Sequence, residues 1–272
     1  MSSPSQDSAL LELPDGMNVY WLEQTEADLP PDNAWLSLEE ARQMDRLRFA
    51  KRRADWRLGR WTAKRAVALC LGIPEQPREL AEIEILAAPS GAPEVVLDVQ
   101  LATNFAIPLV APRISLSHSC DRAVCAVALS GAALGCDLEE IAPRSDAFVA
   151  DFFTAQEQAT VARSSPADRP RISTLIWSAK ESALKALHTG LRLDTRSLIV
   201  TAGESFCEWQ TLRVHHRDGQ IFLGWWQEAE GFVRTIVSNH VRPNLPIYLR
   251  EIAASTIHRT TDRSLALNAP RR

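Results

Sequence analysis

The chain has 272 residues, of which 46% are apolar and 24% are charged, and its formal net charge is −4. This ordinary globular composition excludes wholesale disorder, and the length is enough for one large domain or two smaller ones. The net negative charge argues against a protein that binds nucleic acids or membranes non-specifically through its whole surface. No apolar run approaches the roughly 20 residues of a membrane helix, and no secretory signal pattern opens the chain. The five cysteines form no CxxC pair, so we expect free thiols in a reducing cytoplasm.

Lysine is scarce in this sequence. Of the 30 basic side chains only four are lysines, namely Lys51, Lys64, Lys180 and Lys185. Lysine carries a compact, strongly hydrated point charge, whereas arginine presents a planar fork. Because Lys180 and Lys185 lie in one short motif, that motif is the first place to look for a site.

The first half of the chain predicts a strand, helices and further strands. Residues 1–15 are a loose lead-in, and 17–23 are rich in aromatic and β-branched residues, as in a strand. Residues 37–71 have helical spacing. We expect two helices there, broken near 49–53, with Ser37 and Glu40 forming a capping box and Gly72 ending the second helix. Strands are predicted at 83–86, 93–97 and 113–117, and residues 122–140 predict a pair of strands turning at Ser130-Gly131.

The second half repeats this order. It predicts a strand at 134–139, helices at 146–163 and 171–188, and strands at 198–200, 208–216, 220–226 and 232–238. We therefore predict an α+β fold of two similar lobes, each a small, mostly antiparallel sheet packed with helices, although no residue pattern is repeated. The predicted boundaries are a lead-in at 1–15, an N-terminal lobe at 16–132, a C-terminal lobe with metal motifs at 133–248, and a partly mobile tail at 249–272.

The segment GCDLEE places two carboxylates on one face of a strand. Asp137 and Glu139 are two residues apart, so their side chains project together at roughly 7 Å spacing, while Cys136 and Leu138 face a core. Paired carboxylates suit a hard divalent cation completed by water and phosphate oxygens. The alternative is that these two carboxylates are solvated or form an ion pair with an arginine.

The segment WSAKESALKA predicts a helix with Glu181 and Lys185 four residues apart. One interpretation is a surface ion pair worth a few tenths of a kcal/mol. The other is that Glu181 is a third metal ligand and that Lys185 meets a phosphate.

Two further segments could contact anions. ISLSHS ends a predicted strand in Ser117 and His118, which could bind phosphate oxygens, although a lone histidine is more often structural. No nucleophile elbow accompanies them. The stretch 42–65 holds ten basic residues against Asp45 and Asp55. It could be a solvated face or could bind a small anion, an acidic protein or, as a rival, nucleic acid.

The ordered set of SHS, GCDLE, FFTAQE and WSAKESALKA resembles the 4′-phosphopantetheinyl transferase superfamily. The length and lobe order resemble its long, pseudo-dimeric (Sfp-like) group. The resemblance implies that Mg²⁺, or alternatively Mn²⁺, is held with the coenzyme A pyrophosphate by Asp137, Glu139 and Glu181. It implies coenzyme A contacts from Lys51, Arg60, Ser117, His118, Asp137, Lys180 and Lys185. Glu181 and Lys185 would be the catalytic pair.

One position departs from the family pattern. Family members usually carry Gly-Lys-Pro where this chain has Gly91, Ala92 and Pro93. The resemblance therefore predicts that a cationic contact to the nucleotide is missing here or comes from another residue.

The function that this resemblance implies is transfer of 4′-phosphopantetheine from coenzyme A to a serine of an acyl or peptidyl carrier protein, with release of 3′,5′-ADP. We expect a cytoplasmic monomer that binds neither nucleic acid nor membrane. The alternative is a non-catalytic protein that binds coenzyme A or a carrier protein and retains the fold.

Overall fold

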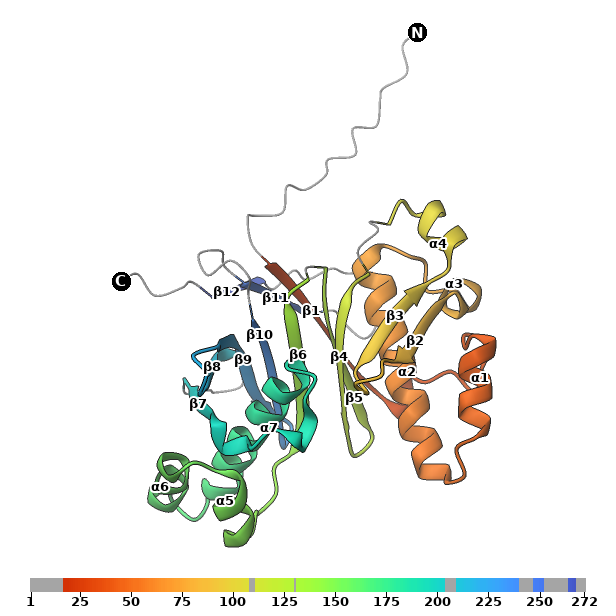
Figure 1. Ribbon diagram of the computed structural model, residues 1–272. Helices are drawn as coiled ribbons and strands as arrows, with labels where there is room; N and C mark the ends of the chain where they lie inside the picture. Colours follow the sequence, from red (N-terminus) through yellow and green to blue (C-terminus); the bar gives the residue numbers. More distant parts are fainter. Residues whose placement is uncertain are drawn as a thin grey trace.

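Two five-stranded sheets form the centre of the molecule in the computed structural model, which describes residues 17–107, 111–129, 131–203, 209–239, 247–251 and 264–267 (Figure 1). The first sheet has the order β12 (Ser264–Leu267), β11 (Ile247–Glu251), β1 (Met17–Thr25), β5 (Arg122–Ala128), β4 (Arg113–Ser119). The second has the order β6 (Ala133–Glu140), β10 (Phe232–Asn239), β9 (Ile221–Ala229), β8 (Gln210–His216), β7 (Leu198–Ala202). Each sheet packs with helices, which confirms the predicted α+β class and its mostly antiparallel sheets.

The helices of the first lobe are α1 (Leu38–Asp45), α2 (Ala50–Leu71), α3 (Pro77–Ala81) and α4 (Val99–Asn104), beside the hairpin β2 (Ile83–Ala87) and β3 (Pro93–Leu97). The predicted break in the helical stretch is confirmed. Ser37 accepts a hydrogen bond from the Glu40 amide in the predicted capping box, and Gly72 ends α2 in the left-handed region at φ 69°.

The helices of the second lobe are α5 (Asp146–Phe152), α6 (Ala155–Arg163) and α7 (Arg169–Ala186). The prediction of one helix over 146–163 is wrong. Phe153 adopts an extended backbone, and Thr154 begins a new helix as its N-cap, with Glu157 closing a capping box. The spacing of Thr154 and Glu157 is the same as that of Ser37 and Glu40, so this break has a signal in the sequence.

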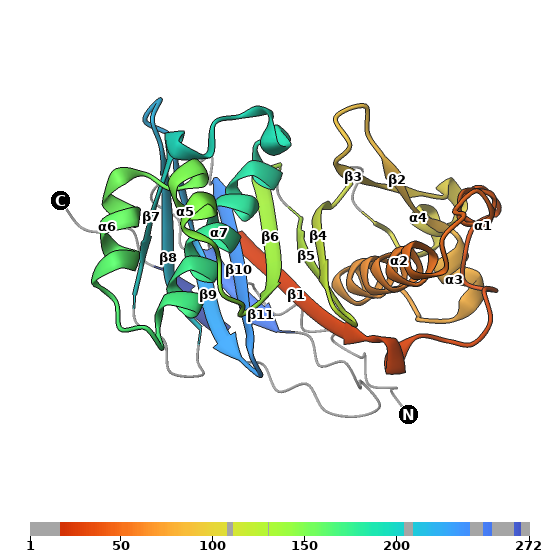
Figure 2. The ribbon, with the colours of Figure 1, turned by 90° about the horizontal axis from the view of Figure 1, so that it is seen from below.

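The two sheets face each other across an apolar layer. Figures 1 and 2 show α2 and α7 on opposite sides of the pair of sheets, with the sheets between them. Val19 and Trp21 of β1 pack in this layer with Cys136 and Leu138 of β6, and the ring of Trp21 meets that of Trp209 at 5.3 Å. The central strands β5 and β10 are therefore buried on both faces.

The strands predicted over 122–140 exist but do not pair with each other. β5 pairs with β1 and β4, whereas β6 pairs with β10, so the chain changes sheet between Ala128 and Ala133. Ser130, half of the predicted turn, lies outside the described residues. β5 is apolar on both faces and β6 is almost entirely buried, and patterns of this kind do not reveal which strand is the partner.

Two strands follow the last one predicted. β11 pairs with β1 in parallel and β12 pairs with β11, so the chain after residue 246 adds to the sheet of the first lobe. The predicted boundary at 248/249 falls inside β11. The predicted lead-in at 1–15 and the rest of the tail lie outside the described residues.

A polar pattern repeats in the two lobes, although no repeat is visible in the sequence. Lys64 pairs with Glu40 in the first lobe and Lys180 pairs with Glu157 in the second, and all four side chains are almost fully buried. Each glutamate also closes the capping box of its own helix. The two lobes therefore resemble each other in their cores as well as in their element order.

Two properties of the described residues bear on the composition arguments. Cys70, Cys120, Cys125 and Cys136 are free thiols, whereas Cys207 lies outside the described part of the chain. None of the helices described in this structure has the length and apolarity that crossing a membrane requires.

Gly135 sets the distance between α7 and β6. A Cβ at this position would overlap the carbonyl oxygen of Ser182, and backbone cannot move aside as a side chain can. We predict that Gly135→Ala lowers the free energy of unfolding by about 3 kcal/mol or more. Gly59, inside α2, has open space within 4 Å of the position that a Cβ would take. As the control, Gly59→Ala should stabilise by about 0.5–1 kcal/mol in the same denaturant titration. Equal behaviour of the two variants would contradict this description of the helix–sheet contact.

Candidate functional site

The edges of the two sheets meet where β4 lies beside β6. The Cys136 amide of β6 donates a hydrogen bond to Ser115 Oγ of β4 at 2.9 Å. Further along the two strands, Ser117 Oγ donates to Asp137 Oδ1 at 2.8 Å. The two sheets therefore contribute neighbouring polar side chains to one place.

Lys185 of α7 joins this pair. Its Nζ lies 2.7 Å from Asp137 Oδ1, 2.9 Å from Ser117 Oγ and 3.1 Å from the carbonyl oxygen of Cys136. These three acceptors match the three donors of an ammonium group. We call Ser117, Asp137 and Lys185 the lobe junction, because they come from both sheets and from α7.

The junction is only partly shielded from solvent, since 29% of the Lys185 side chain is exposed. Asp137 is 3% exposed. Burial would lower the pKa of Lys185, but the Asp137 carboxylate, helped by Cys136 and Glu181, holds that pKa above its ordinary value. Lys185 is therefore a fixed cation at neutral pH.

Glu139 lies on the same face of β6, one pleat beyond Asp137. Its carboxylate accepts hydrogen bonds from Arg144 Nη2 at 2.9 Å and from Trp177 Nε1 at 3.2 Å. Burial and the Asp137 charge raise the pKa of Glu139, and Arg144 opposes them. Trp177 belongs to the motif that contains Glu181, whereas Arg144 belongs to none of the motifs and has no signal in the sequence.

Glu181 completes a cluster of three carboxylates. It is half-buried on α7, and burial, followed by the charge of Asp137, raises its pKa, with Glu139 adding to the effect. Because Asp137 raises the pKa of both glutamates, the three groups share one electrostatic environment.

The chemistry of the three carboxylates suits a hard cation, although they are not already arranged around one point as metal ligands. Asp137 Oδ2 is buried and has no hydrogen-bond partner among the described residues. Within that part of the chain, no three His, Cys, Asp or Glu side chains are already arranged as a metal site. Mg²⁺ commonly takes one or two protein carboxylates and completes its shell with water and phosphate oxygens. An orphaned carboxylate oxygen beside two acids that repel each other suits that mode of binding.

Lys180 does not lie at this cluster. Its side chain is fully buried, and its Nζ contacts Glu157 Oε2 at 2.7 Å, the Thr195 carbonyl at 2.9 Å and the Phe152 carbonyl at 3.1 Å. The prediction that Lys180 contacts coenzyme A is corrected here, because all its donors serve the core of the second lobe. Adjacent positions on a helix point about 100° apart, which separates Lys180 from Glu181.

Three other predicted residues lie away from the cluster. Lys51 is exposed and pairs with Asp55 at 3.5 Å. The guanidinium of Arg60 stacks over the Trp56 ring at 4.9 Å. His118 is exposed, on the opposite face of β4 from Ser117. Their contacts with coenzyme A stay predictions.

A pocket of about 250 Å³ adjoins the junction. It lies between the two lobes, with Ile114, Leu134 and Leu184 as apolar walls and Lys185 and His188 as cationic or polar groups. The segment Gly91-Ala92-Pro93 also lines it, so the residues that depart from the family pattern face this pocket. His188 has no signal in the sequence, because it follows the helical motif.

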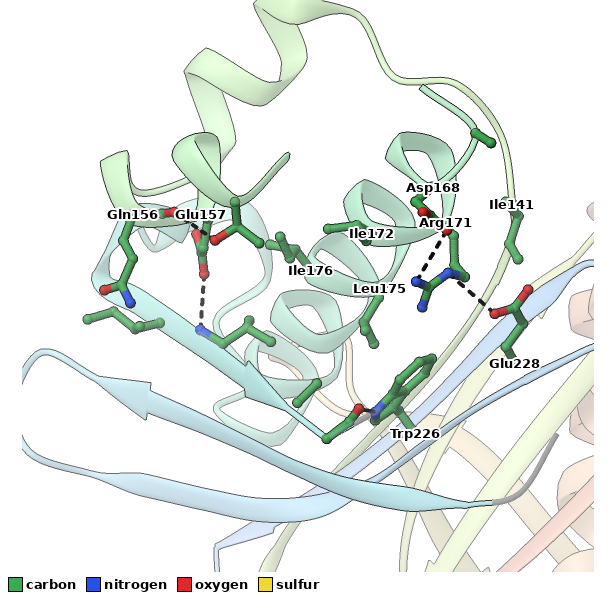
Figure 3. Close-up of a pocket in the computed structure, with 16 residues that line it drawn as sticks. Ile141, Gln156, Glu157, Asp168, Arg171, Ile172, Leu175, Ile176, Trp226 and Glu228 are labelled. Carbon is green, nitrogen blue, oxygen red and sulfur yellow. Dashed lines mark hydrogen bonds and ion pairs between the residues drawn. The ribbon is translucent and has the colours of Figure 1, made fainter. Parts of the chain in front are cut away.

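A larger pocket of about 750 Å³ lies elsewhere in the second lobe (Figure 3). Ile172, Leu175 and Trp226 form an apolar floor, and Arg171 sits at the rim, 3.6 Å from Glu228. The three carboxylates of the cluster do not line it. Its size alone therefore does not connect it with the chemistry of the junction.

Comparison with known proteins confirms the family resemblance. The family model described as the 4′-phosphopantetheinyl transferase superfamily matches residues 133–236, which include Asp137, Glu139, Glu181 and Lys185. A solved structure of Helicobacter pylori holo-[acyl-carrier-protein] synthase in complex with coenzyme A is similar, at 18% identity and a TM-score of 0.33. The match covers 40% of this chain and 96% of the synthase. No curated protein matches the chain.

The raised pKa of Glu181 has a consequence for stability. A carboxyl group with a higher pKa in the folded state than in the unfolded state destabilises the fold once it is ionised. We predict that Glu181→Gln raises the thermal midpoint at pH 7 by at most about 2–4 °C, since partial exposure screens the repulsion. The gain should fade as pH falls through the raised pKa of the folded state and should be absent below the ordinary glutamate pKa of 4.5, where the side chain is protonated in both states.

The control for this measurement is Glu94→Gln, because Glu94 is exposed on β3. It should show no comparable gain. A loss of stability in Glu181→Gln at pH 7 would contradict the described cluster.

Proposed function

We propose that this chain, which carries a region of the 4′-phosphopantetheinyl transferase superfamily at residues 133–236, transfers 4′-phosphopantetheine from coenzyme A to a serine of an acyl or peptidyl carrier protein. The observation that carries this proposal is the lobe junction together with the neighbouring carboxylates Glu139 and Glu181. A fixed ammonium, a hydroxyl and three carboxylates meet beside a pocket between the lobes, within or next to the matched residues. Membership of the long, Sfp-like group is part of the proposal.

The junction supplies the groups that a pyrophosphate needs. Lys185 Nζ and Ser117 Oγ already lie 2.9 Å apart and could both donate to phosphate oxygens. Asp137, Glu139 and Glu181 would hold Mg²⁺, with Mn²⁺ as the alternative. Bound there, the cation would act as a Lewis acid and as a template for the phosphates. For Glu139 this requires that its carboxylate exchange the Arg144 contact.

Glu181 is the candidate general base. It is half-buried beside the junction, and in the metal-free protein burial, followed by the Asp137 charge, raises its pKa. The carrier serine hydroxyl would transfer its proton to Glu181, directly or through water, as its oxygen forms a bond to the β-phosphorus of coenzyme A. The bridging P–O bond breaks, and 3′,5′-ADP leaves.

Lys185 would offset the negative charge that builds on the leaving phosphate. In phosphoryl transfer the protein contributes mainly positioning and electrostatic stabilisation. Because Asp137 keeps Lys185 protonated, this charge is present throughout the reaction. Asp137 would therefore have two roles, to keep Lys185 protonated and to bind the cation.

The carrier protein would approach a basic surface at the corner between α1 and α2. Exposed side chains there are Arg42, Arg46, Arg48, Lys51, Arg52 and Arg53. Phe49, 73% exposed, stands among them. Carrier proteins of this kind are acidic, so complementary charge would speed their encounter. A monomeric state, a cytoplasmic location and the lack of nucleic-acid or membrane binding stay predictions.

A second candidate is a protein that binds coenzyme A or a carrier protein without catalysis. The observation that favours it is Ala92, an uncharged residue in the wall of the pocket where the family usually has lysine. The two candidates differ in whether a carrier protein gains mass.

The test of the function is to incubate the protein with coenzyme A, Mg²⁺ and an apo acyl carrier protein and to weigh the carrier. We expect a gain of one phosphopantetheine. Asp137→Ala and Glu181→Gln should each abolish the gain, because each removes a hard ligand beside phosphate charge. Glu94→Gln is the surface control and should retain it. Binding of coenzyme A without any gain in mass would favour the second candidate.

Lys185→Arg tests whether the junction needs a compact cation. The forked guanidinium is broader than an ammonium group and would displace the charge by about 1 Å, which can cost on the order of 100-fold in rate. We predict such a loss in kcat. The control is the reverse exchange Arg78→Lys, since Arg78 is exposed on α3, outside the junction and the basic surface, and should tolerate the change. Lys64 is unsuitable as a control because it is buried. Equal activity of the two variants would show that Lys185 does not act as proposed.

A further inference from the structure

Lys180 is the most deeply buried charged side chain next to the proposed catalytic residues. Its Nζ connects α7 to Glu157 of α6, to the end of α5 through the Phe152 carbonyl, and to the loop before β7 through the Thr195 carbonyl. Glu157 in turn accepts hydrogen bonds from the amides of Thr154 at 2.8 Å and Val200 at 3.0 Å. One ion pair thus connects four segments of the second lobe to α7.

The first lobe contains the same arrangement. Lys64 Nζ contacts Glu40, the Leu80 carbonyl at 2.9 Å and the Trp35 carbonyl at 3.0 Å. Glu40 accepts from the amides of Ser37 and Ile85, each at 3.0 Å. In both lobes one of the two carbonyls, that of Trp35 or Phe152, lies two residues before the N-cap. The strand amide that donates to the glutamate lies five residues after the other carbonyl in both lobes. The two anchors, each a buried lysine–glutamate pair with these partners, therefore match group for group.

The two anchors differ in what their helices carry. In α7 the residues one and five positions after the anchoring lysine are Glu181 and Lys185. In α2 the equivalent positions are Arg65 and Leu69. Arg65 pairs with Glu75, and Leu69 packs against the core of the first lobe. The same buried ion pair therefore occurs once with and once without the proposed catalytic side chains.

We propose that Lys180, together with Glu157, is a positioning residue that fixes the rotation of α7 about its axis, so that Glu181 and Lys185 face Asp137. This inference rests on the proposed function. Lys185 lies about 140° around the helix from Lys180, since five residues span about 500°. A helix held on the α6 side by Lys180 and on the β6 side by the Lys185–Asp137 pair cannot rotate without breaking one of them.

A competing explanation gives this task to other contacts of α7. Ser178 and Ser182 of α7 lie 2.9 and 2.7 Å from Thr235 Oγ1 of β10, and Gly135 allows their close approach. If these contacts suffice, the Lys180 anchor contributes only stability. The two explanations predict different kinetics for matched variants.

The experiment compares Lys180→Met with Lys64→Met, using coenzyme A, Mg²⁺ and an apo acyl carrier protein. Both variants lose a buried cation and should lose comparable stability. We expect kcat to fall on the order of 100-fold in Lys180→Met, with KM for the carrier protein little changed, and to stay within about threefold of the native value in Lys64→Met. Equal kcat in the two variants, at temperatures where both are folded, would overturn the proposal.

Amide hydrogen exchange gives a readout that does not need activity. Residues 181–186 should lose protection in Lys180→Met and keep it in Lys64→Met, whereas unchanged protection there would count against the proposal. If either single variant fails to fold, the pairs Lys180→Met/Glu157→Gln and Lys64→Met/Glu40→Gln replace it, because they leave no unpaired buried charge. A native protein that transfers nothing, with the expected exchange pattern, would overturn the proposed function and leave the positioning role standing.

Discussion

The ion pair between Lys185 and Asp137 is the contact on which the proposed site depends. It joins α7 to β6 at 2.7 Å, and Ser117 brings in β4 of the other sheet. Several features of the fold serve this contact. Gly135 and the small side chains of α7 let the helix approach the sheet closely, and the change of sheet between Ala128 and Ala133 places β6 beside β4.

The same arrangement concentrates negative charge. Burial, followed by the charge of Asp137, raises the pKa of both Glu139 and Glu181, and Lys185, Arg144 and Trp177 offset only part of these shifts. A cluster that repels itself in the absence of a ligand is better explained by binding than by stability. Buried sites of this kind commonly reduce stability in exchange for function.

Much of the fold could be predicted from local patterns. The Ser37 capping box, the break before α2 and most strands follow from signals within a few residues. Pairing between distant segments could not be predicted, because the doubly buried strands β5 and β6 give no sign of their partners. Spacing predicted only that Asp137 and Glu139 share a face and that Glu181 and Lys185 are neighbours on a helix, and the family resemblance joined the two pairs into one site. Lys180 was misassigned because its acceptors, two carbonyls and Glu157, are separated from it by 15 to 28 positions. Of the four lysines in this chain, Lys64 and Lys180 form the buried anchors and Lys185 belongs to the proposed site. The rarity of lysine therefore does not by itself identify a site.

Calorimetric titration of coenzyme A into the protein, with and without Mg²⁺, tests the central claim that the lobe junction binds a metal–pyrophosphate group. We predict that Mg²⁺ raises the affinity of the native protein for coenzyme A about tenfold or more, and that Asp137→Asn abolishes this gain. An affinity that is independent of Mg²⁺, or a gain that persists in Asp137→Asn, would contradict it.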